Sequence, residues 1–137
     1  MAQNIHATSV SLGSKGILLI GPSGSGKSDM ALKLIANYGA KLVSDDRTDI
    51  TQKGNVIYAS APENIKGLLE VRGVGIINVK NKSRATVKAV FELTSEKIER
   101  YPVPQKYQLL GVELPFFKIN PFEASASAKI LASLSLL

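Results

Sequence analysis

The sequence predicts an α/β domain built on a mixed β-sheet, and three observations lead to this fold class. The chain has 137 residues, a common size for one domain, and its hydrophobic share of 45% is that of an ordinary globular protein. One unit of apolar strand, glycine-rich loop and amphipathic helix stands near the start. Most of the remaining apolar segments are short and bounded by turn residues, as strands are. We therefore expect residues 1–137 to form a single domain.

Two strands and a helix are expected in the first forty residues. Residues 5–11 alternate β-branched and polar side chains, and a turn signal at residues 13–16 leads to the apolar run at residues 17–20. Within residues 28–38 the apolar side chains recur every three or four positions, and Gly39 follows as a residue that ends helices. The expected order is therefore a hairpin, a glycine-rich loop and a helix.

The rest of the chain is expected to consist mostly of strands, with one packing helix at the end. Residues 53–55, Lys-Gly-Asn, favour a hairpin turn, and Pro115 separates the last two predicted strands. The strands are expected at residues 41–44, 49–51, 56–58, 74–79, 87–93, 111–114 and 116–119. From Glu123 the chain is rich in alanine and serine, and its last apolar residues have helical spacing. These are Ile130, Leu131, Leu134 and Leu137.

Several classes of protein are excluded by what the sequence lacks. It contains no cysteine, which removes disulfides, zinc ribbons, iron–sulfur clusters and thiol nucleophiles. Residues 1–6 do not form a basic segment followed by an apolar run, so they do not predict a secretory signal. No stretch reaches about 18 uncharged apolar residues, the length of a spanning helix. We expect a soluble, cytoplasmic protein that does not bind a membrane.

The net charge of +6 indicates an anionic partner or a solvated basic face. Residues 71–106 contain eight lysine and arginine residues against three glutamates. Aromatic residues make up only 6% of the chain, and none alternate with these basic residues as stacking platforms would. We therefore expect no nucleic-acid binding.

The clearest chemical signal is a phosphate loop at residues 21–28. The segment reads Gly-Pro-Ser-Gly-Ser-Gly-Lys-Ser and fits G-x-x-x-x-G-K-[ST], a match expected by chance in well under ~1% of chains of this length. The glycines allow backbone N–H groups to converge on a phosphate at a helix N-terminus. Lys27 would bridge the β- and γ-phosphates, and the Ser28 hydroxyl would bind Mg²⁺. The alternative is a glycine-rich turn that contains Lys-Ser by coincidence.

Three further sites could carry chemistry, and each also has a structural interpretation. Asp45 and Asp46 end a predicted strand, where a carboxylate can bind Mg²⁺ or accept a proton. Adjacent strand residues point to opposite sides, so only one should face the phosphates; the alternative is a solvated turn. Glu70 and Arg72 fall on one face of a predicted strand, where they could form a surface salt bridge. His6 lies in a strand beside the phosphate-loop strand and could be a structural residue.

Together these segments resemble one family, the C-terminal catalytic domain of HPr kinase/phosphorylase. The resemblance rests on the phosphate loop, on Leu42-Val43-Ser44-Asp45-Asp46 and on the stretch from Leu69 to Val79, and it covers residues 4–120. It implies a core similar to that of phosphoenolpyruvate carboxykinase. It also implies an ATP- and Mg²⁺-dependent serine kinase whose substrate is HPr, the phosphocarrier of the sugar phosphotransferase system. Fuller members of the family add an N-terminal domain and form hexamers, so a homo-oligomer is expected.

The resemblance also implies roles for individual residues. Lys27 would be catalytic, Ser28 and Glu70 would bind Mg²⁺, and Asp46 would be the general base. Asp45 would assist as a metal or water ligand. His6 would lie near the phosphates, and Arg100 would stabilise charge on the transferred phosphoryl group. Nucleotide binding would fall to Gly21, Pro22, Ser23, Gly24, Ser25, Gly26, Lys27 and Ser28.

The chain departs from the family pattern in three places. We expect the family's N-terminal domain to be absent, as in the short form seen in alphaproteobacteria, and Ala7 stands where glycine is usual. The family's Pro-Gly-Arg-Asn-like segment, which is linked to dephosphorylation, is replaced by residues 119–123, Ile-Asn-Pro-Phe-Glu. We therefore expect phosphorylase activity that is weak or absent relative to the kinase activity. Two other functions stay open at this point: a kinase of a small acceptor, marked by a deep pocket beside Asp46, and a non-catalytic nucleotide-binding regulator.

Overall fold

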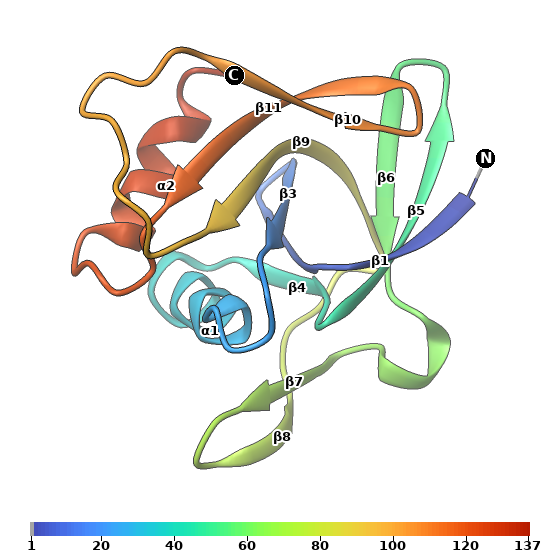
Figure 1. Cartoon of the computed structure of the whole chain (residues 1–137). Helices are drawn as coiled ribbons and strands as arrows, with labels where there is room; N and C mark the ends of the chain where they lie inside the picture. The colour runs from blue at the N-terminus through green and yellow to red at the C-terminus, as the bar shows by residue number, and fades with distance from the viewer. Residues whose placement is uncertain (1) are drawn as a thin grey trace.

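A curled, mixed β-sheet carries both α-helices of the described chain on one face in the computed structural model (Figure 1). The structure describes residues 2–137; Met1, the first residue of the segment considered for a secretory signal, lies outside them. The strands are β1 Ala2–His6, β2 Thr8–Leu12, β3 Lys15–Ile20, β4 Lys41–Ser44, β5 Arg47–Lys53, β6 Val56–Ser60, β7 Leu68–Val71, β8 Gly75–Asn78, β9 Arg84–Leu93, β10 Gln105–Leu109 and β11 Val112–Ile119. The helices are α1 Lys27–Tyr38, α2 Ala126–Leu134 and the short 3₁₀ turn η1 Glu63–Ile65.

Three parallel strands define the edge of the sheet at which the phosphate loop lies. The main sheet has the order β1-β5-β6-β9-β3-β2-β4, with β11 added to β9 and β10 added to β11. β3 and β11 both run parallel to β9, so these three strands end at the same edge of the sheet, at Ile20, Ile119 and Leu93 respectively. β7 and β8 form a separate hairpin that projects from the sheet (Figure 1). In open α/β sheets, this carboxyl edge is the usual place for a ligand.

The hydrophobic core consists of two clusters, one on each face of the sheet. Ile17 and Leu19 of β3 pack with both helices in the first cluster, whereas Leu18 between them belongs to the second. Successive side chains of a strand point to opposite faces, so a strand buried on both faces reads as an unbroken apolar run. This burial explains residues 17–20 of the sequence. It also fixes the position from which the phosphate loop begins.

Most of the predicted elements are confirmed, and two are corrected in the first half of the chain. The segment at residues 5–11 is not one strand: it divides at Ala7 into β1, which pairs with β5, and β2, which pairs with β3. Alternation alone cannot show that a strand changes partners. Arg72 lies in the turn after β7 and not in the strand, so Glu70 and Arg72 do not share a strand face as expected.

In the second half of the chain, the two strands predicted around Pro115 are a single strand, β11. Pro115 pairs with Lys106 of β10, and β11 joins β9 only from Phe116, so β11 is still an edge where the proline stands. Proline is tolerated at such an edge. β10 was not expected. The C-terminal helix is confirmed, but it ends at Leu134, which leaves Leu137 beyond it and exposed. None of the helices within residues 2–137 is long and apolar enough to cross a membrane.

Candidate active site

The phosphate loop connects β3 to the first residue of α1, as its sequence predicts. Gly26 caps the helix in the left-handed conformation, with φ of 96°, which a residue with a side chain rarely adopts. Gly21 leaves β3 where the chain is crowded: a Cβ atom there would lie 2.7 Å from Ser25 Oγ and 3.0 Å from the Leu93 carbonyl oxygen. The loop therefore needs glycine at both of its ends to fold back over the sheet edge.

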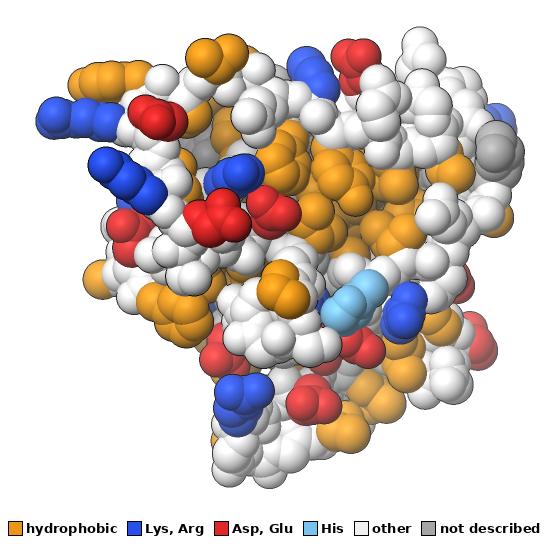
Figure 2. Space-filling model, in the orientation of Figure 1, with side chains coloured by type: hydrophobic (Ala, Val, Ile, Leu, Met, Phe, Trp, Pro, Cys, Tyr) orange, Lys and Arg blue, Asp and Glu red, His pale blue; other side chains and the backbone are white. Residues whose placement is uncertain are grey.

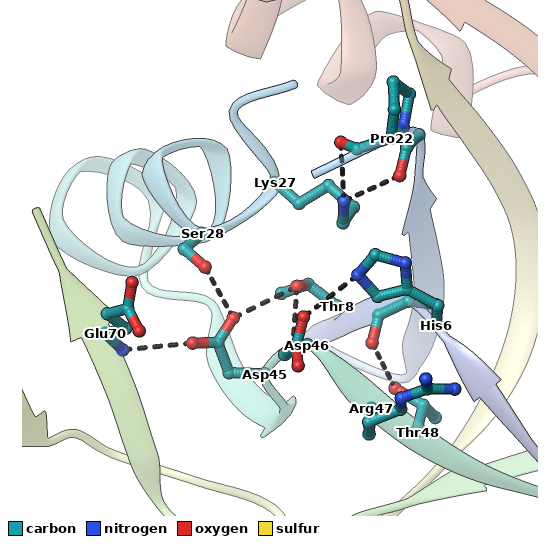
Figure 3. Close-up of polar contacts among 12 residues, drawn as sticks. His6, Thr8, Pro22, Lys27, Ser28, Asp45, Asp46, Arg47, Thr48 and Glu70 are labelled. Atoms are coloured by element: carbon teal, nitrogen blue, oxygen red, sulfur yellow. Dashed lines mark hydrogen bonds and ion pairs between the residues drawn. The ribbon is translucent and has the colours of Figure 1, made fainter. Parts of the chain in front are cut away.

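Lys27 is buried within this loop. Its ammonium group donates hydrogen bonds to the carbonyl oxygens of Gly21 at 2.7 Å and Pro22 at 3.0 Å (Figure 3). Burial lowers the pKa of Lys27 below its ordinary value, while the negative charges of Asp46 and Asp45 act in the opposite direction. The two carboxylates thus favour the charged form of Lys27, and it is this form whose ammonium group can bind a phosphate.

The Asp45 carboxylate is the buried centre of the site. Its Oδ1 accepts hydrogen bonds from the Thr8 hydroxyl at 3.1 Å and the Ser28 hydroxyl at 2.7 Å, and its Oδ2 accepts one from the Glu70 backbone N–H at 3.0 Å. These three donors come from β2, α1 and β7, so one carboxylate connects three separate elements (Figure 3). Three donors compensate for the burial of this charge.

Asp46 has a different environment from its neighbour. Its backbone is in the left-handed region, with φ of 67°, and its side chain is 70% exposed. The carboxylate contacts His6 Nε2 at 3.0 Å, because the pairing of β1 with β5 places His6 opposite Arg47, the residue after Asp46. The Asp46 backbone N–H donates to the Thr8 hydroxyl at 3.1 Å. The Thr8 hydroxyl therefore binds both aspartates.

Asp45 and Asp46 do point in different directions, but not because adjacent residues of a strand alternate, as expected from the sequence. Both lie beyond Ser44, the last residue of β4, so the alternation of strand side chains does not apply to them. They separate because Asp46 turns into the left-handed conformation while Asp45 points inward. Left-handed backbone in a residue other than glycine is uncommon and often occurs at functional sites.

The oxygen atoms around Asp45 fit a magnesium ion that is bound mainly by phosphates and water. Ser28 Oγ and Asp45 Oδ1 lie 2.7 Å apart at the start of α1, and both are hard oxygen ligands. Within residues 2–137, no group of three or more His, Asp or Glu side chains is close enough to hold a metal by itself. Glu70 contacts Asp45 through its backbone and its side chain is exposed, so its role as a metal ligand stays a prediction.

The remaining predicted residues lie apart from this network. Arg100 is in the irregular segment between β9 and β10, and its guanidinium lies 5.8 Å from the centre of the Tyr101 ring. No hydrogen bond or ion pair within residues 2–137 joins it to the phosphate loop or to either aspartate. The alternative ion pair between Glu70 and Arg72 does not form in the described chain either.

Thr8 is the residue of this network that sequence reasoning missed. It is fully buried in β2 and contacts both aspartates through one hydroxyl group. Thr8 lies in a stretch of alternating β-branched and polar residues, so nothing in the sequence marked it as more than an ordinary strand residue. The only available signal was that β2 was expected beside the phosphate-loop strand.

Comparison with known proteins places this geometry in a family. The family model described as the HPr Serine kinase C-terminal domain matches residues 1–133. Curated relatives called HPr kinase/phosphorylase include those of Lactobacillus acidophilus, 40% identical over 67% of this chain, and Prosthecochloris aestuarii, 36% identical over 87% of it. The relative from Mycoplasma pneumoniae is 35% identical over 94% of the chain. The matches span 31%, 39% and 46% of these relatives, so the chain corresponds to less than half of their length.

A solved structure shares the fold over almost the whole chain. It is described as the Hpr(Ser) kinase/phosphatase from Coxiella burnetii and superimposes with a TM-score of 0.85 at 24% identity. The match covers 98% of this chain and 95% of the solved one, and it confirms the predicted mixed α/β fold. From the family match and the identity to its relatives, the chain belongs to the HPr serine kinase C-terminal domain family.

Proposed function

We propose that this chain is an ATP-dependent protein kinase that phosphorylates a serine of HPr. The relatives named HPr kinase/phosphorylase support the class of reaction and the acceptor. The observation that carries the proposal is the exposure of Asp46, which is 70% accessible although its charge acts on Lys27. A kinase of a small acceptor would need a closed pocket around its base. Figure 2 shows the single histidine, His6, at the surface beside a broad apolar area, which a folded protein can approach.

The phosphate loop would bind the triphosphate, with Lys27 as the main cation. To do so, the Lys27 ammonium would exchange the Gly21 and Pro22 carbonyl oxygens for phosphate oxygens. A phosphate dianion stabilises the charged form of a buried lysine much more than two neutral carbonyl groups do. Lys27 would thus favour both the bound nucleotide and the transferring phosphoryl group.

Asp46 would act as the general base towards the acceptor. The serine oxygen forms a bond to the γ-phosphorus as the bond to the β-phosphate oxygen breaks, and the hydroxyl proton moves to an Asp46 oxygen. His6 would help to hold the Asp46 carboxylate in place through the 3.0 Å contact between His6 Nε2 and Asp46 Oδ1. A bound Mg²⁺, held by Ser28 and Asp45, would neutralise charge on the phosphate oxygens. ATP as the donor places the reaction in the cytoplasm in this proposal.

In the same proposal, the kinase direction dominates over phosphorolysis. Attack by inorganic phosphate on phosphoserine needs a cation to position the incoming dianion. Asn120, Pro121 and Phe122 supply none next to the loop, and within the described residues Arg100 has no hydrogen bond or ion pair with the loop. Loss of phosphoserine from HPr should therefore be little faster with inorganic phosphate than without it. A phosphate-dependent rate of phosphoserine loss equal to the rate of phosphorylation by ATP would refute the expectation that the kinase direction dominates.

The direct test of the proposed function is transfer of phosphate to purified HPr. Incubation of the chain with Mg-ATP and HPr should yield HPr that is heavier by one phosphoryl group on a serine, measured by mass spectrometry. Lys27→Ala should abolish this product and weaken Mg-ATP binding, because Lys27 contacts both the bound and the transferring phosphate. Complete absence of phosphoserine, with ATP bound normally, would favour a non-catalytic regulator.

Asp46→Asn should slow transfer by about 10²-fold or more, the usual contribution of a general base, and leave Mg-ATP binding intact. Asparagine tolerates the left-handed backbone at this position, so the loss would report on the charge and not on strain. Asp49→Asn removes the same charge from β5 and should leave the rate unchanged. A rate for Asp46→Asn within threefold of the wild type would rule out this base.

Thr8→Val should lower kcat by about tenfold with little change in KM for ATP, because the Asp46 carboxylate would be held less well in the position where it accepts the serine proton. The change removes the hydroxyl that binds Asp45 and Asp46, and Thr8→Ser should restore the rate.

The matched control is Thr48→Val. Thr48 is equally buried, but within residues 2–137 its hydroxyl forms hydrogen bonds only with the Ser9 hydroxyl and the Ala7 carbonyl oxygen. The Thr48→Val variant should lose about as much stability in urea unfolding as Thr8→Val does, while its kcat stays that of the wild type. Equal loss of kcat in the two variants would show that Thr8 acts only through stability.

A further inference from the structure

The phosphate loop has two sides, which the order of strands in the sheet defines. β3 pairs with β2 on one side, and β2 pairs with β4, whose end carries Asp45 and Asp46. On its other side β3 pairs with β9, which is joined by β11. The turn that carries Asp45 and Asp46, whose charges act on Lys27, therefore lies on the β4 side of the loop. The ends of β9 and β11 lie on the opposite side (Figure 1).

A hollow of about 410 Å³ opens on this second side. It is formed by the outer face of the phosphate loop, by the end of β9 with the residues that follow it, and by the turn after β11. Its lining consists of residues 22–25, residues 92–96, Pro121 and Phe122. Sites for small ligands commonly have volumes of about 300–1,000 Å³. A hollow that continues directly from a phosphate loop, at the carboxyl ends of parallel strands, is suited to the non-phosphate part of a nucleotide.

The polar groups of this hollow suit hydroxyl and amino groups better than phosphates. Glu92 and Glu96 bring two carboxylates, which repel phosphate oxygens and accept hydrogen bonds from sugar hydroxyls. The Ser25 hydroxyl oxygen is buried and has no hydrogen-bond partner within residues 2–137. A buried polar atom without a partner carries a cost that a bound donor or acceptor would remove.

One aromatic ring is available for a base. Phe122 lies in the lining of the hollow and is 75% exposed, so its ring is accessible to a ligand in the hollow. The turn that carries it is fixed, because the Phe122 N–H donates to Asn120 Oδ1 at 3.0 Å. Pro121 of this turn lies beside the loop: a Cβ atom on Gly26 would lie 3.6 Å from the Pro121 Cβ. Base–aromatic stacking uses such an exposed ring face.

We propose that this hollow binds the nucleoside of the phosphoryl donor, with the base on Phe122 and the ribose hydroxyls towards Glu92 and Glu96. The proposal rests on the proposed function, since it assumes that the loop binds a triphosphate. The triphosphate then runs across the loop, and its last phosphate reaches Lys27, Asp45 and Asp46 on the other side. The donor is accordingly a nucleoside triphosphate, and pyrophosphate or tripolyphosphate gains nothing from the hollow.

The test compares binding of Mg-ATP and Mg-tripolyphosphate to the full chain by titration calorimetry. ATP should bind at least tenfold more tightly than tripolyphosphate. Phe122→Ala should weaken ATP binding about five- to tenfold, as expected for loss of one stacked base, and leave tripolyphosphate binding unchanged. Tyr38→Ala removes a partly exposed aromatic ring from the far end of α1 and should change neither affinity.

The outcomes separate this inference from the proposed function. Equal affinities for ATP and tripolyphosphate, or an unchanged ATP affinity in Phe122→Ala, would overturn the nucleoside site while leaving the phosphate loop in place. Equal weakening of both ligands would also overturn it, because the variant would then act on the loop. Failure of both ligands to bind the wild type would refute the proposed function itself.

Discussion

The carboxylate of Asp45 is the interaction on which the rest of the site depends. It accepts hydrogen bonds from the Thr8 and Ser28 hydroxyls and the Glu70 N–H, and so connects β2, α1 and β7 to the turn after β4. A buried carboxylate is costly unless its oxygens are bonded, and each of its donors would lose its partner without it. The start of α1 and the turn that carries Asp46 are therefore held as one unit, and Thr8 connects Asp46 to the same unit through its backbone.

The strand order then assigns different chemistry to the two sides of the phosphate loop. The loop leaves β3, which lies between β2 on one side and β9 on the other. The acidic turn follows β4, on the β2 side, where the charges of Asp46 and Asp45 act on the Lys27 ammonium. The hollow formed by the ends of β9 and β11 lies on the other side. In the proposed function, transfer takes place at an exposed acidic turn that a protein acceptor can reach, while the donor is held from the opposite side.

Local patterns were sufficient for the parts of the site that one segment encodes. The phosphate loop has fixed spacing within eight residues, and the strand before it and the helix after it have clear periodicities. The role of Thr8 could not be predicted, because its partners Asp45 and Asp46 lie almost forty residues away along the chain. Phe122 was passed over for the same reason: its position depends on the pairing of β11 with β9. The left-handed backbone of Asp46 follows from the turn into β5, which no short motif encodes. The functional roles of the individual side chains stay predictions.

A crystal structure of this chain with Mg²⁺ and a non-hydrolysable ATP analogue would test the central claim most directly. We expect the Lys27 ammonium to leave the Gly21 and Pro22 carbonyl oxygens and to bind phosphate oxygens, with the last phosphate on the Asp46 side. Ser28 and Asp45 should lie next to the metal ion, and the base should lie on Phe122. A last phosphate directed away from Asp46, or a Lys27 still bonded to both carbonyl oxygens, would contradict the account.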